Sequence, residues 1–346
     1  MKIFRVFIVC VIFSAMLLLP GCGDDRPVIY VFNWGDYIGE NVLRDFTNET
    51  GIRVRYETFD SNEAMYAKVR NNPGVYDVLV PSEYMAERMI NEGMLERINL
   101  DNIPNARYID DRFRGFPIDP YDNYFLSYMW GTVGILYNTT MVYDVVDSWD
   151  VLWDERYAGL IFMYDSSRDS IGAALKRLGY SLNTRNIDEL NRAVDSLREQ
   201  MPLVRAYLTD PIKDAMIAGE GALAIVYSGD ALFCQMHNPD LNFVIPREGS
   251  NVWVDGFVIP IGARNQEGAE AFINFMLRPD IAARNTEYIG YTTTNWAALE
   301  LIDEDMRNNP IFWPTDEELE RLEMFYDLGD FRSTFEGAWL ELFIGN

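Results

Sequence analysis

Residues 28–37 read VIYVFNWGDY, an apolar run that stops abruptly at an aromatic and an acidic residue. Its branched and aromatic first half predicts a buried strand, and Asn33 and Gly35 predict the turn that ends it. Trp34 and Asp36 then lie at the tip of that strand. Because ligands of open α/β sheets bind beyond the carboxyl ends of the strands, an aromatic face beside a carboxylate there suits an organic cation. A core tryptophan beside a turn aspartate is the alternative, since turns favour Asp for backbone reasons.

Helix and strand patterns alternate after this stretch, which predicts a parallel, doubly wound sheet. The chain has 346 residues, more than one compact core usually holds, so two domains are expected. The first alternation comprises a helix over 40–51, a strand over 52–56, a helix around 63–70, a strand over 76–80 and a turn at 81–84.

Residues 125–138 read as strands broken by Gly131 and Gly134. This pattern fits either a crossing between two domains or a local bulge inside one. A second alternation of helices and strands follows. It comprises a polar loop at 166–169 that caps a helix, a helical stripe over 190–201, a strand over 222–227, a helix opened by residues 228–230, a strand over 252–261, a helical stripe over 269–277 and a helical region over 316–343.

The first residues predict export. Two basic residues begin an apolar stretch over 3–19 that is shorter than the ~20 residues of a comfortable membrane span. The run over 19–22, LPGC, is similar to a lipoprotein processing site, although Pro20 departs from the small residue usual there. We therefore expect a signal peptide over 1–21, a lipid on Cys22, a tether over 22–27 and a periplasmic, membrane-anchored product. An uncleaved N-terminal anchor is the alternative.

The formal charge of -25 argues against binding of nucleic acid or of an anionic membrane surface by the body of the protein. A cationic small ligand fits that field, and acidity that serves only solubility is the alternative. Beyond the signal and Cys22, the sole cysteine is Cys234, so no internal disulfide is expected. Its apolar neighbours predict a buried, inert thiol.

Sequence motifs for catalysis, metals and nucleotides are absent. His237 is the only histidine, and it lies beside Asn238 and Pro239 in a predicted turn, so no Ser/His/Asp or Cys/His arrangement is expected. The chain has no CxxC, HExxH, GxGxxG or GxxxxGK, so neither a metal nor a nucleotide cofactor is expected. An aromatic residue paired with a carboxylate at a strand end recurs instead, in Trp34 with Asp36, Tyr227 with Asp230 and Trp253 with Asp255.

Asp255 is the strongest single anomaly, because a carboxylate beside a glycine in a hydrophobic strand is costly unless it is paired. A partner arginine in the core is the alternative explanation, and Asp230 also fits a helix-capping acid. Two carboxylates held apart by aromatic walls suit a linear diamine, whose ammonium groups need charged acceptors and whose methylenes need apolar cover. Neutral sugars would need more amides and fewer bare charges.

Segments along nearly the whole mature chain resemble those of the bacterial spermidine/putrescine-binding proteins of polyamine import systems, in the same order. The resemblance implies a type II periplasmic binding protein fold, with two α/β lobes, a hinge and a ligand cleft between the lobes. It implies lobe 1 over 28–131 plus 252–297 and lobe 2 over 132–251 plus 298–346. The segments are FNWGDYI, FTNETGI, SNEAMYAKV, YDVLVPSEY, SWDVLWDERYAG, ALKRLGYS, WVDGFVIP, FINFMLRPD and EYIGYTTTN.

The same resemblance implies the site residues. Departures from the family pattern are Gly35 in place of a hydroxyl residue, Ser166 in place of an acid, Tyr227 in place of a Trp, and Phe325 near a usual Gln. Asp230 matches an acid of putrescine-preferring members. The implied aromatic walls are Trp34, Tyr37, Tyr84, Tyr227, Trp253 and Tyr291, the amine-binding acids are Asp36, Asp169, Asp230 and Asp255, and the polar contacts are Ser82 and Ser166.

The sequence therefore predicts a lipid-anchored polyamine-binding protein that favours putrescine or binds both putrescine and spermidine. Its expected partner is a membrane ABC permease, it is expected to be a monomer, and it is expected to perform no catalytic step. Two alternatives from other classes stay open. One is a tethered glycoside hydrolase that uses two acids amid aromatic platforms, and the other is a sensor module that reports polyamine to a receptor.

Overall fold

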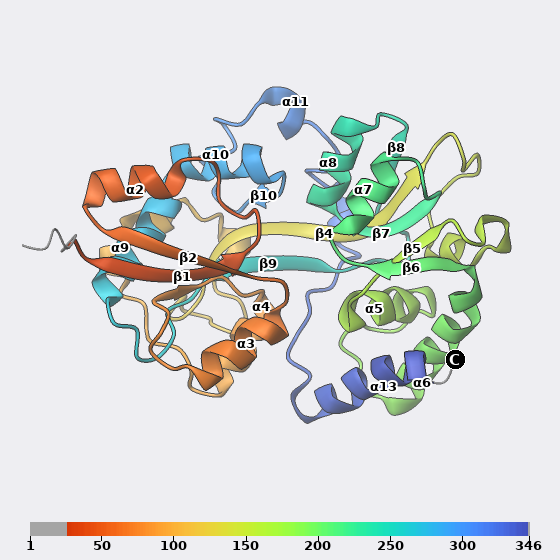
Figure 1. The fold of residues 1–346 in the computed structure, drawn as a ribbon, viewed down its shortest axis with the longest axis horizontal. Helices are drawn as coiled ribbons and strands as arrows, with labels where there is room; N and C mark the ends of the chain where they lie inside the picture. Colours follow the sequence, from red (N-terminus) through yellow and green to blue (C-terminus); the bar gives the residue numbers. More distant parts are fainter. Residues whose placement is uncertain (1–25, 345–346) are drawn as a thin grey trace, which may run out of the picture.

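The computed structural model describes residues 26–344, which form two α/β lobes joined by long strands (Figure 1). The first lobe is built on a parallel sheet with strand order β2-β1-β3. Strands β1 and β2 pair in parallel from Val28 and Arg53 to Trp34 and Phe59. The elements of this lobe are β1 (Val28–Trp34), α2 (Val42–Thr50), β2 (Arg53–Phe59), α3 (Asn62–Asn71), β3 (Val78–Leu79), α4 (Glu83–Asn91), α9 (Gln266–Met276) and α10 (Pro279–Ile289).

A seven-stranded mixed sheet has the main path β10-β4-β7-β5-β6, with β8 and β9 also paired to β4. Strands β5, β6, β7 and β8 of this sheet form the centre of the second lobe, and β4 extends from it toward the first lobe. Strand β5 runs parallel to both β6 and β7, as the alternating pattern predicts. The remaining elements are β4 (Leu126–Asn138), β5 (Ile161–Tyr164), α5 (Ser167–Arg177), α6 (Ile187–Gln200), β6 (Val204–Leu208), α7 (Pro211–Ile217), β7 (Leu223–Tyr227), α8 (Ser228–His237), β8 (Leu241–Val244), β9 (Val252–Phe257), β10 (Thr292–Thr293), α11 (Glu304–Arg307), α12 (Asp316–Leu319) and α13 (Arg332–Ile344).

Strands β4 and β9 run between the lobes (Figure 1). One half of β4 pairs antiparallel with β9, and the other half pairs with β7 and β8. The prediction that Gly131 and Gly134 break this stretch is wrong, because the strand is continuous. A Cβ on Gly131 would lie 2.6 Å from Cζ2 of Trp253, and one on Gly134 would lie 2.5 Å from Cζ of Phe243. The glycines therefore admit neighbouring side chains, and the crossing between lobes is the correct alternative.

The prediction of a turn over residues 81–84 is also wrong. Helix α4 begins at Glu83, and Ser82 is its N-cap residue with an extended backbone. Residues 79–82 also form isolated antiparallel bridges with strand residues on the β9 side, Leu79 with Val258 and Ser82 with Asp255. The first lobe's sheet is thereby joined to β9 beside the start of α4.

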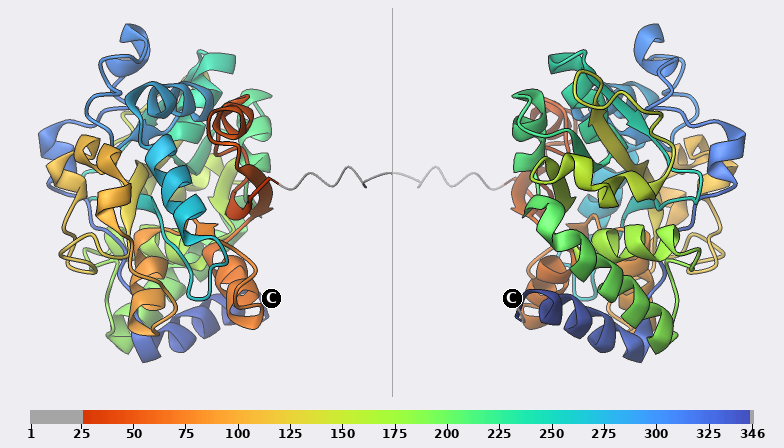
Figure 2. Two further views of the ribbon diagram at one scale, coloured as in Figure 1. Left: turned by 90° about the vertical axis from the view of Figure 1, so that its left-hand side faces the viewer. Right: turned by 90° about the vertical axis from the view of Figure 1, so that its right-hand side faces the viewer.

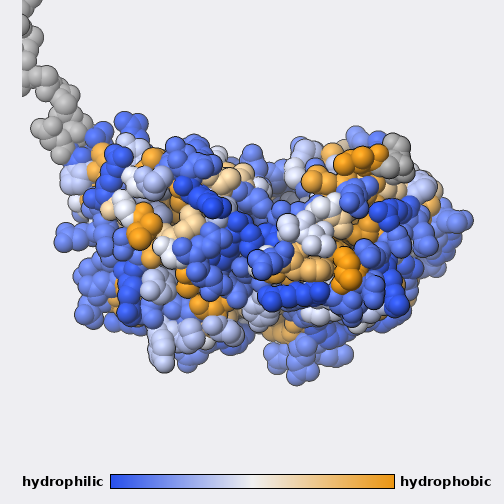
Figure 3. Space-filling view, turned by 90° about the horizontal axis from the view of Figure 1, so that it is seen from below, coloured by the Kyte–Doolittle hydropathy of each residue, from blue (hydrophilic) through white to orange (hydrophobic). Residues whose placement is uncertain are grey.

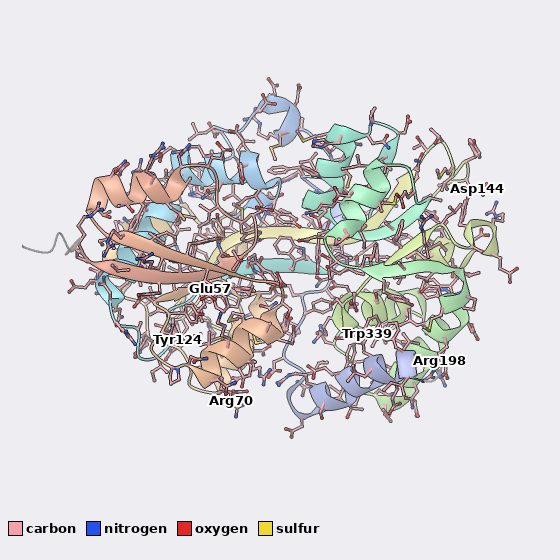
Figure 4. The ribbon with its side chains drawn as sticks, in the orientation of Figure 1. Glu57, Arg70, Tyr124, Asp144, Arg198 and Trp339 are labelled. Carbon is pink, nitrogen blue, oxygen red and sulfur yellow. The ribbon has the colours of Figure 1, made fainter. Side chains whose placement is uncertain are left out.

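The C-terminal region is helical only at its ends, although the sequence predicted a helical region over 316–343. Helix α12 ends at Leu319, and residues 320–328 contain no helix. Helix α13 then packs against α5 and α6 along the lower edge of the second lobe (Figure 2). Trp339, labelled in Figure 4, lies on α13 and packs edge-on against Tyr207 and Phe343.

The surface seen from below is mainly hydrophilic (Figure 3), in keeping with the acidic composition. Cys234 is buried, and burial raises the pKa of its thiol to about 12, which agrees with the predicted buried thiol. No helix of residues 26–344 is long and apolar enough to cross a bilayer. The predicted signal peptide over 1–21 and the lipid site Cys22 lie outside the described residues.

Candidate ligand-binding site

Asp255 is a buried carboxylate at the centre of β9, with 5% of its surface exposed. The hydroxyl of Tyr37 donates to Oδ2 at 2.6 Å, and the hydroxyl of Ser82 donates to Oδ1 at 2.6 Å. No ion pair with an arginine is found for Asp255 among residues 26–344, so the core-arginine alternative is wrong. Burial raises the pKa of Asp255 to about 6, and the two hydroxyl groups act in the opposite direction.

The two hydroxyl donors come from different elements and are themselves held in place. Asn62, the first residue of α3, donates from Nδ2 to the Ser82 hydroxyl at 3.0 Å and accepts the Ser82 backbone N–H at 3.1 Å. The same amide donates to the hydroxyl of Tyr84 at 3.1 Å. The Tyr37 carbonyl accepts the hydroxyl of Tyr128 at 3.1 Å. The hydrogen-bond donors of Asp255 are therefore preorganised at the ends of β1 and β3.

Glu83 is a second buried carboxyl beside Asp255, and the sequence reasoning missed it. Its Oε2 accepts the backbone N–H of Val254 at 2.8 Å, whereas Oε1 has no hydrogen-bond partner within the described part of the chain. Burial is the main cause that raises the pKa of Glu83 to about 8, and the charge of Asp255 raises it further. Glu83 is therefore mostly protonated at neutral pH. No local sequence signal indicates its burial, because the contact that buries Glu83 comes from the distant strand β9.

The raised pKa of Glu83 predicts how stability depends on pH. Between about pH 4.5 and 8 the folded protein holds a proton on Glu83 that the unfolded chain releases, so this group lowers stability as pH rises. The isosteric Glu83→Gln variant carries no such proton. We therefore expect the free energy of unfolding of the wild type, measured by urea denaturation, to fall relative to that of the variant as pH rises. The difference between the two proteins should change by about 1 kcal/mol per pH unit across this window. A gap between the two proteins that stays constant from pH 5 to 8 would contradict this assignment.

Three aromatic side chains gather next to Asp255 at the junction of the lobes. Trp253 lies edge-on to Tyr291 with ring centroids 4.9 Å apart, and edge-on to Tyr227 at 6.1 Å. The Tyr291 ring lies 5.9 Å from that of Tyr37. It also rests on the first turn of α8, where a Cβ on Gly229 would lie 2.2 Å from the ring, so only glycine admits this contact. Indole Nε1 of Trp253 is buried and has no hydrogen-bond partner among the described residues.

Asp169 is a third buried carboxylate, contributed by the first turn of α5 in the second lobe. The hydroxyl of Tyr227 donates to its Oδ2 at 3.0 Å, and the Ser166 hydroxyl caps the helix by accepting the Asp169 backbone N–H at 3.4 Å. Burial raises the pKa of Asp169. The predicted capping role is confirmed for Ser166, whereas residues 167–169 already belong to helix α5 rather than to a loop.

Arg168 lies between the lobes, next to Asp169 in the chain. Its guanidinium stands 4.2 Å from the ring centroid of Phe325 and 5.6 Å from that of Tyr84. It donates to the carbonyl of Tyr326 and to the side chain of Asn183, each at 3.2 Å. Tyr84 and Phe325 are themselves edge-on at 6.2 Å. The segment over 320–328 therefore brings Phe325 to the border of the site, a place that helical spacing could not indicate.

Asp230 lies in the first turn of α8 with 13% of its side chain exposed, and it has a cationic partner. The Lys213 ammonium of α7 is 3.4 Å from Oδ1 of Asp230. Burial raises the pKa of Asp230, whereas Lys213 and a hydrogen bond from Tyr291 act to lower it. Asp230 thus contacts the aromatic group through Tyr291, but its charge is already balanced.

Trp34 and Asp36 stand apart from these contacts. Trp34 packs against Phe59 with centroids 4.5 Å apart, and its carbonyl accepts the hydroxyl of Tyr56 at 3.2 Å. Asp36 is exposed at the tip of β1 and has a left-handed backbone with φ of 48°. The strand-tip placement predicted for both residues is confirmed. In residues 26–344 no group of three or more His, Cys, Asp or Glu side chains is arranged to hold a metal ion.

Residues 41–314 match the family of bacterial extracellular solute-binding proteins. The chain belongs to this family. The spermidine/putrescine-binding periplasmic protein of Escherichia coli is 36% identical over 324 residues, which are 93% of each chain. This similarity agrees with the family resemblance inferred from the sequence segments. The E. coli relative is a periplasmic protein.

Solved structures of solute-binding proteins share the fold. The spermidine/putrescine ABC transporter substrate-binding protein PotD of Streptococcus pneumoniae is 40% identical, covers 91% of this chain and 98% of its own, and superposes with a TM-score of 0.81. The TpPotD lipoprotein of Treponema pallidum is 29% identical, covers 91% and 99%, and gives a TM-score of 0.83. The predicted α/β periplasmic binding protein fold is therefore confirmed.

Proposed function

We propose that this solute-binding protein captures linear polyamines such as putrescine and spermidine outside the cytoplasm and delivers them to an ABC importer. The observation that supports this proposal most strongly is the environment of Asp255. This buried carboxylate has neutral hydroxyls as hydrogen-bond partners and lies against aromatic rings. A primary ammonium is the ligand group that such a carboxylate stabilises most, because the charge-assisted hydrogen bond forms away from water.

Asp255 and Asp169 are the proposed acceptors of the two ends of the ligand, one from β9 and one from the second lobe. The rings of Trp253, Tyr227 and Tyr291 cover the methylene chain between them and contribute cation–π attraction at the ammonium groups. In our proposal Tyr37 and Ser82 hold the Asp255 carboxylate in place. The other predicted residues line the approaches to this pair, namely Trp34, Asp36, Tyr84, Ser166 and Asp230.

Closure of the lobes around the ligand is the proposed mechanism of capture. We place lobe 1 at residues 28–131 plus 252–297 and lobe 2 at residues 132–251 plus 298–346. Strands β4 and β9 support these boundaries, because they pair with each other on the first-lobe side while β4 continues into the second sheet. The acidic net charge supports electrostatic steering of a polycation toward the protein.

Membrane tethering is a further part of the proposal. Acylation of Cys22 after removal of residues 1–21 would leave residues 22–27 as a short tether and the two lobes in the periplasm. The T. pallidum structure is titled as a lipoprotein, which supports this reading. We also propose that the protein acts as a monomer and performs no catalytic step.

Isothermal titration with putrescine, spermidine and spermine tests the proposed function. We expect saturable 1:1 heat with putrescine or spermidine at neutral pH. No heat with any of the three would overturn the proposal, and release of sugar from a glycoside substrate would favour the hydrolase alternative instead. Loss of polyamine uptake in a strain lacking the gene would distinguish transport from a purely sensory role.

A further inference from the structure

A small cavity lies beside Asp169 in the second lobe. Helix α5 contributes Asp169, Gly172 and Lys176 to its wall, three residues that share one face of the helix, and Asn251 and Phe325 also line it. The space at its centre has room for about one group the size of a water molecule or an ammonium. Because Asp169 and Phe325 also border the proposed ligand site, the cavity adjoins the second-lobe end of that site.

Asn251 is buried, with 4% of its surface exposed, and its side-chain amide is held in one orientation. Its Nδ2 donates to the carbonyl of Glu323 at 3.0 Å and to that of Val252 at 3.1 Å. A flipped amide would direct its oxygen at these two carbonyl oxygens, which can only accept hydrogen bonds. Oδ1 therefore stays on the other side of the amide, where no group of residues 26–344 donates to it.

Two further polar side chains of the wall already have partners. Ser250 donates from Oγ to the carbonyl of Val133 at 2.6 Å, and the ammonium of Lys176 forms an ion pair with Glu323. Neither is left to donate to the unpartnered amide oxygen. The cavity therefore combines a carboxylate with an amide oxygen, and the group that completes it must be a hydrogen-bond donor.

The charge of Asp169 is partly offset, unlike that of Asp255. Burial is the main cause that raises the pKa of Asp169, whereas the positive charge of the adjacent Arg168 acts in the opposite direction. The donors to Asp255 are neutral hydroxyls. An ammonium bound at Asp169 is therefore repelled by a nearby guanidinium, and a second acceptor in the same cavity would offset part of that cost.

We propose that Asn251 is a further ligand-binding residue, whose Oδ1 accepts a hydrogen bond from the same ligand ammonium that Asp169 binds. This inference rests on the proposed polyamine-binding function. An unsubstituted primary ammonium fits a space of this size, and its three N–H donors can serve both the carboxylate and the amide oxygen. The chemistry of the cavity thus assigns a primary ammonium to the second-lobe end of the ligand.

The test compares Asn251→Leu with Asn251→Asp by calorimetric titration with putrescine at pH 7. Both variants lose the amide donors to Glu323 and Val252, and both side chains are close in shape to asparagine, but only the aspartate keeps an oxygen acceptor. We expect Asn251→Leu to weaken putrescine binding about tenfold or more, and Asn251→Asp to weaken it by less than about threefold. Equal losses in the two variants would overturn the acceptor role.

Asn183→Leu is the matched control. Nδ2 of Asn183 donates to the carbonyl of Met324 at 2.8 Å, so this amide also holds the segment over 320–328, but Asn183 is not among the residues that line the cavity. Its replacement should change putrescine affinity by less than about threefold. A loss as large as that of Asn251→Leu would show that the effect depends on the position of the segment, and would overturn the proposal.

A crystal structure of the wild type with putrescine tests the contact without any variant. We expect the ammonium nitrogen at Asp169 to lie within hydrogen-bonding distance of Oδ1 of Asn251 as well. A water molecule on that oxygen, with the ammonium out of reach, would overturn the role of Asn251 and leave the proposed function intact. Wild-type protein that binds no polyamine in the calorimeter would instead overturn the proposed function itself.

Discussion

Replacing Asp255 by Asn is expected to weaken putrescine binding by about 2 to 5 kcal/mol, a factor of about 30 to several thousand in Kd. The amide keeps the shape of the carboxylate and can still contact the hydroxyls of Tyr37 and Ser82. It cannot neutralise an ammonium group in a buried place. The measurement is calorimetric titration at pH 7 of variants shown by circular dichroism to be folded.

Glu83→Gln is the matched control for Asp255→Asn, because it makes the same carboxyl-to-amide change at the neighbouring buried acid. Glu83 is mostly protonated at pH 7, since burial raises its pKa to about 8. Its replacement should therefore change affinity by less than about threefold. Equal losses in the two variants would show that the binding energy does not depend on the charge of Asp255.

The pH dependence of binding gives a second readout on Asp255. The ligand ammonium binds the ionised Asp255 carboxylate, and the pKa of this group is about 6 in the ligand-free protein. Affinity is therefore retained above pH 6 and falls below it. The wild type should bind about tenfold more weakly at pH 5 than at pH 7. Asp255→Asn should lack this component of the pH dependence, and a wild-type affinity that is flat over this range would contradict the assignment.

Replacing Trp253 by Ala is expected to have the second large effect. Trp253 is 7% exposed and packs edge-on against Tyr291 and Tyr227, so its truncation leaves a cavity and costs about 3–5 kcal/mol of folding stability. Putrescine affinity should fall by about thirtyfold as well, because the apolar cover and the cation–π attraction are lost together. Trp253→Phe should recover most of both losses.

Trp153→Ala separates the two effects of the tryptophan truncation. Trp153 donates from Nε1 to the carbonyl of Ser196 at 2.8 Å inside the second lobe and has no contact with Asp255 or its aromatic neighbours. Its removal should lower the midpoint of urea unfolding while leaving putrescine affinity unchanged. Folded Trp253→Ala protein that binds putrescine as tightly as wild type would contradict the proposed role of the aromatic group.

Local sequence patterns predicted the frame of the site well. The apolar run over 28–34 correctly predicts β1, and the break after it correctly predicts Trp34 and Asp36 at the strand tip. The spacing of Trp253 and Asp255 put both side chains on one face of β9, where they border the same aromatic group. An acid in an apolar strand is a signal that the sequence alone carries, and Asp255 is indeed buried with a hydroxyl donor on each of its two oxygens.

The features that escaped prediction depend on tertiary contacts. The sequence pattern predicts a turn at Glu83, whereas its burial follows from its hydrogen bond with the backbone of Val254, on a strand far away in the chain. Lys213 lies on a short helix with no anomaly of its own, and its ion pair with Asp230 forms only when α7 and α8 pack together. The intrinsic preference of glycine predicts a strand break at Gly131, whereas the Trp253 ring that crosses this position explains why a glycine is needed.

A crystal structure of the protein with putrescine would test the central claim most directly. We predict one terminal nitrogen within hydrogen-bonding distance of the Asp255 carboxylate, the other at Asp169, and the carbon chain between the rings of Trp253, Tyr227 and Tyr291. Putrescine located elsewhere, with Asp255 still contacting only the Tyr37 and Ser82 hydroxyls, would contradict the account.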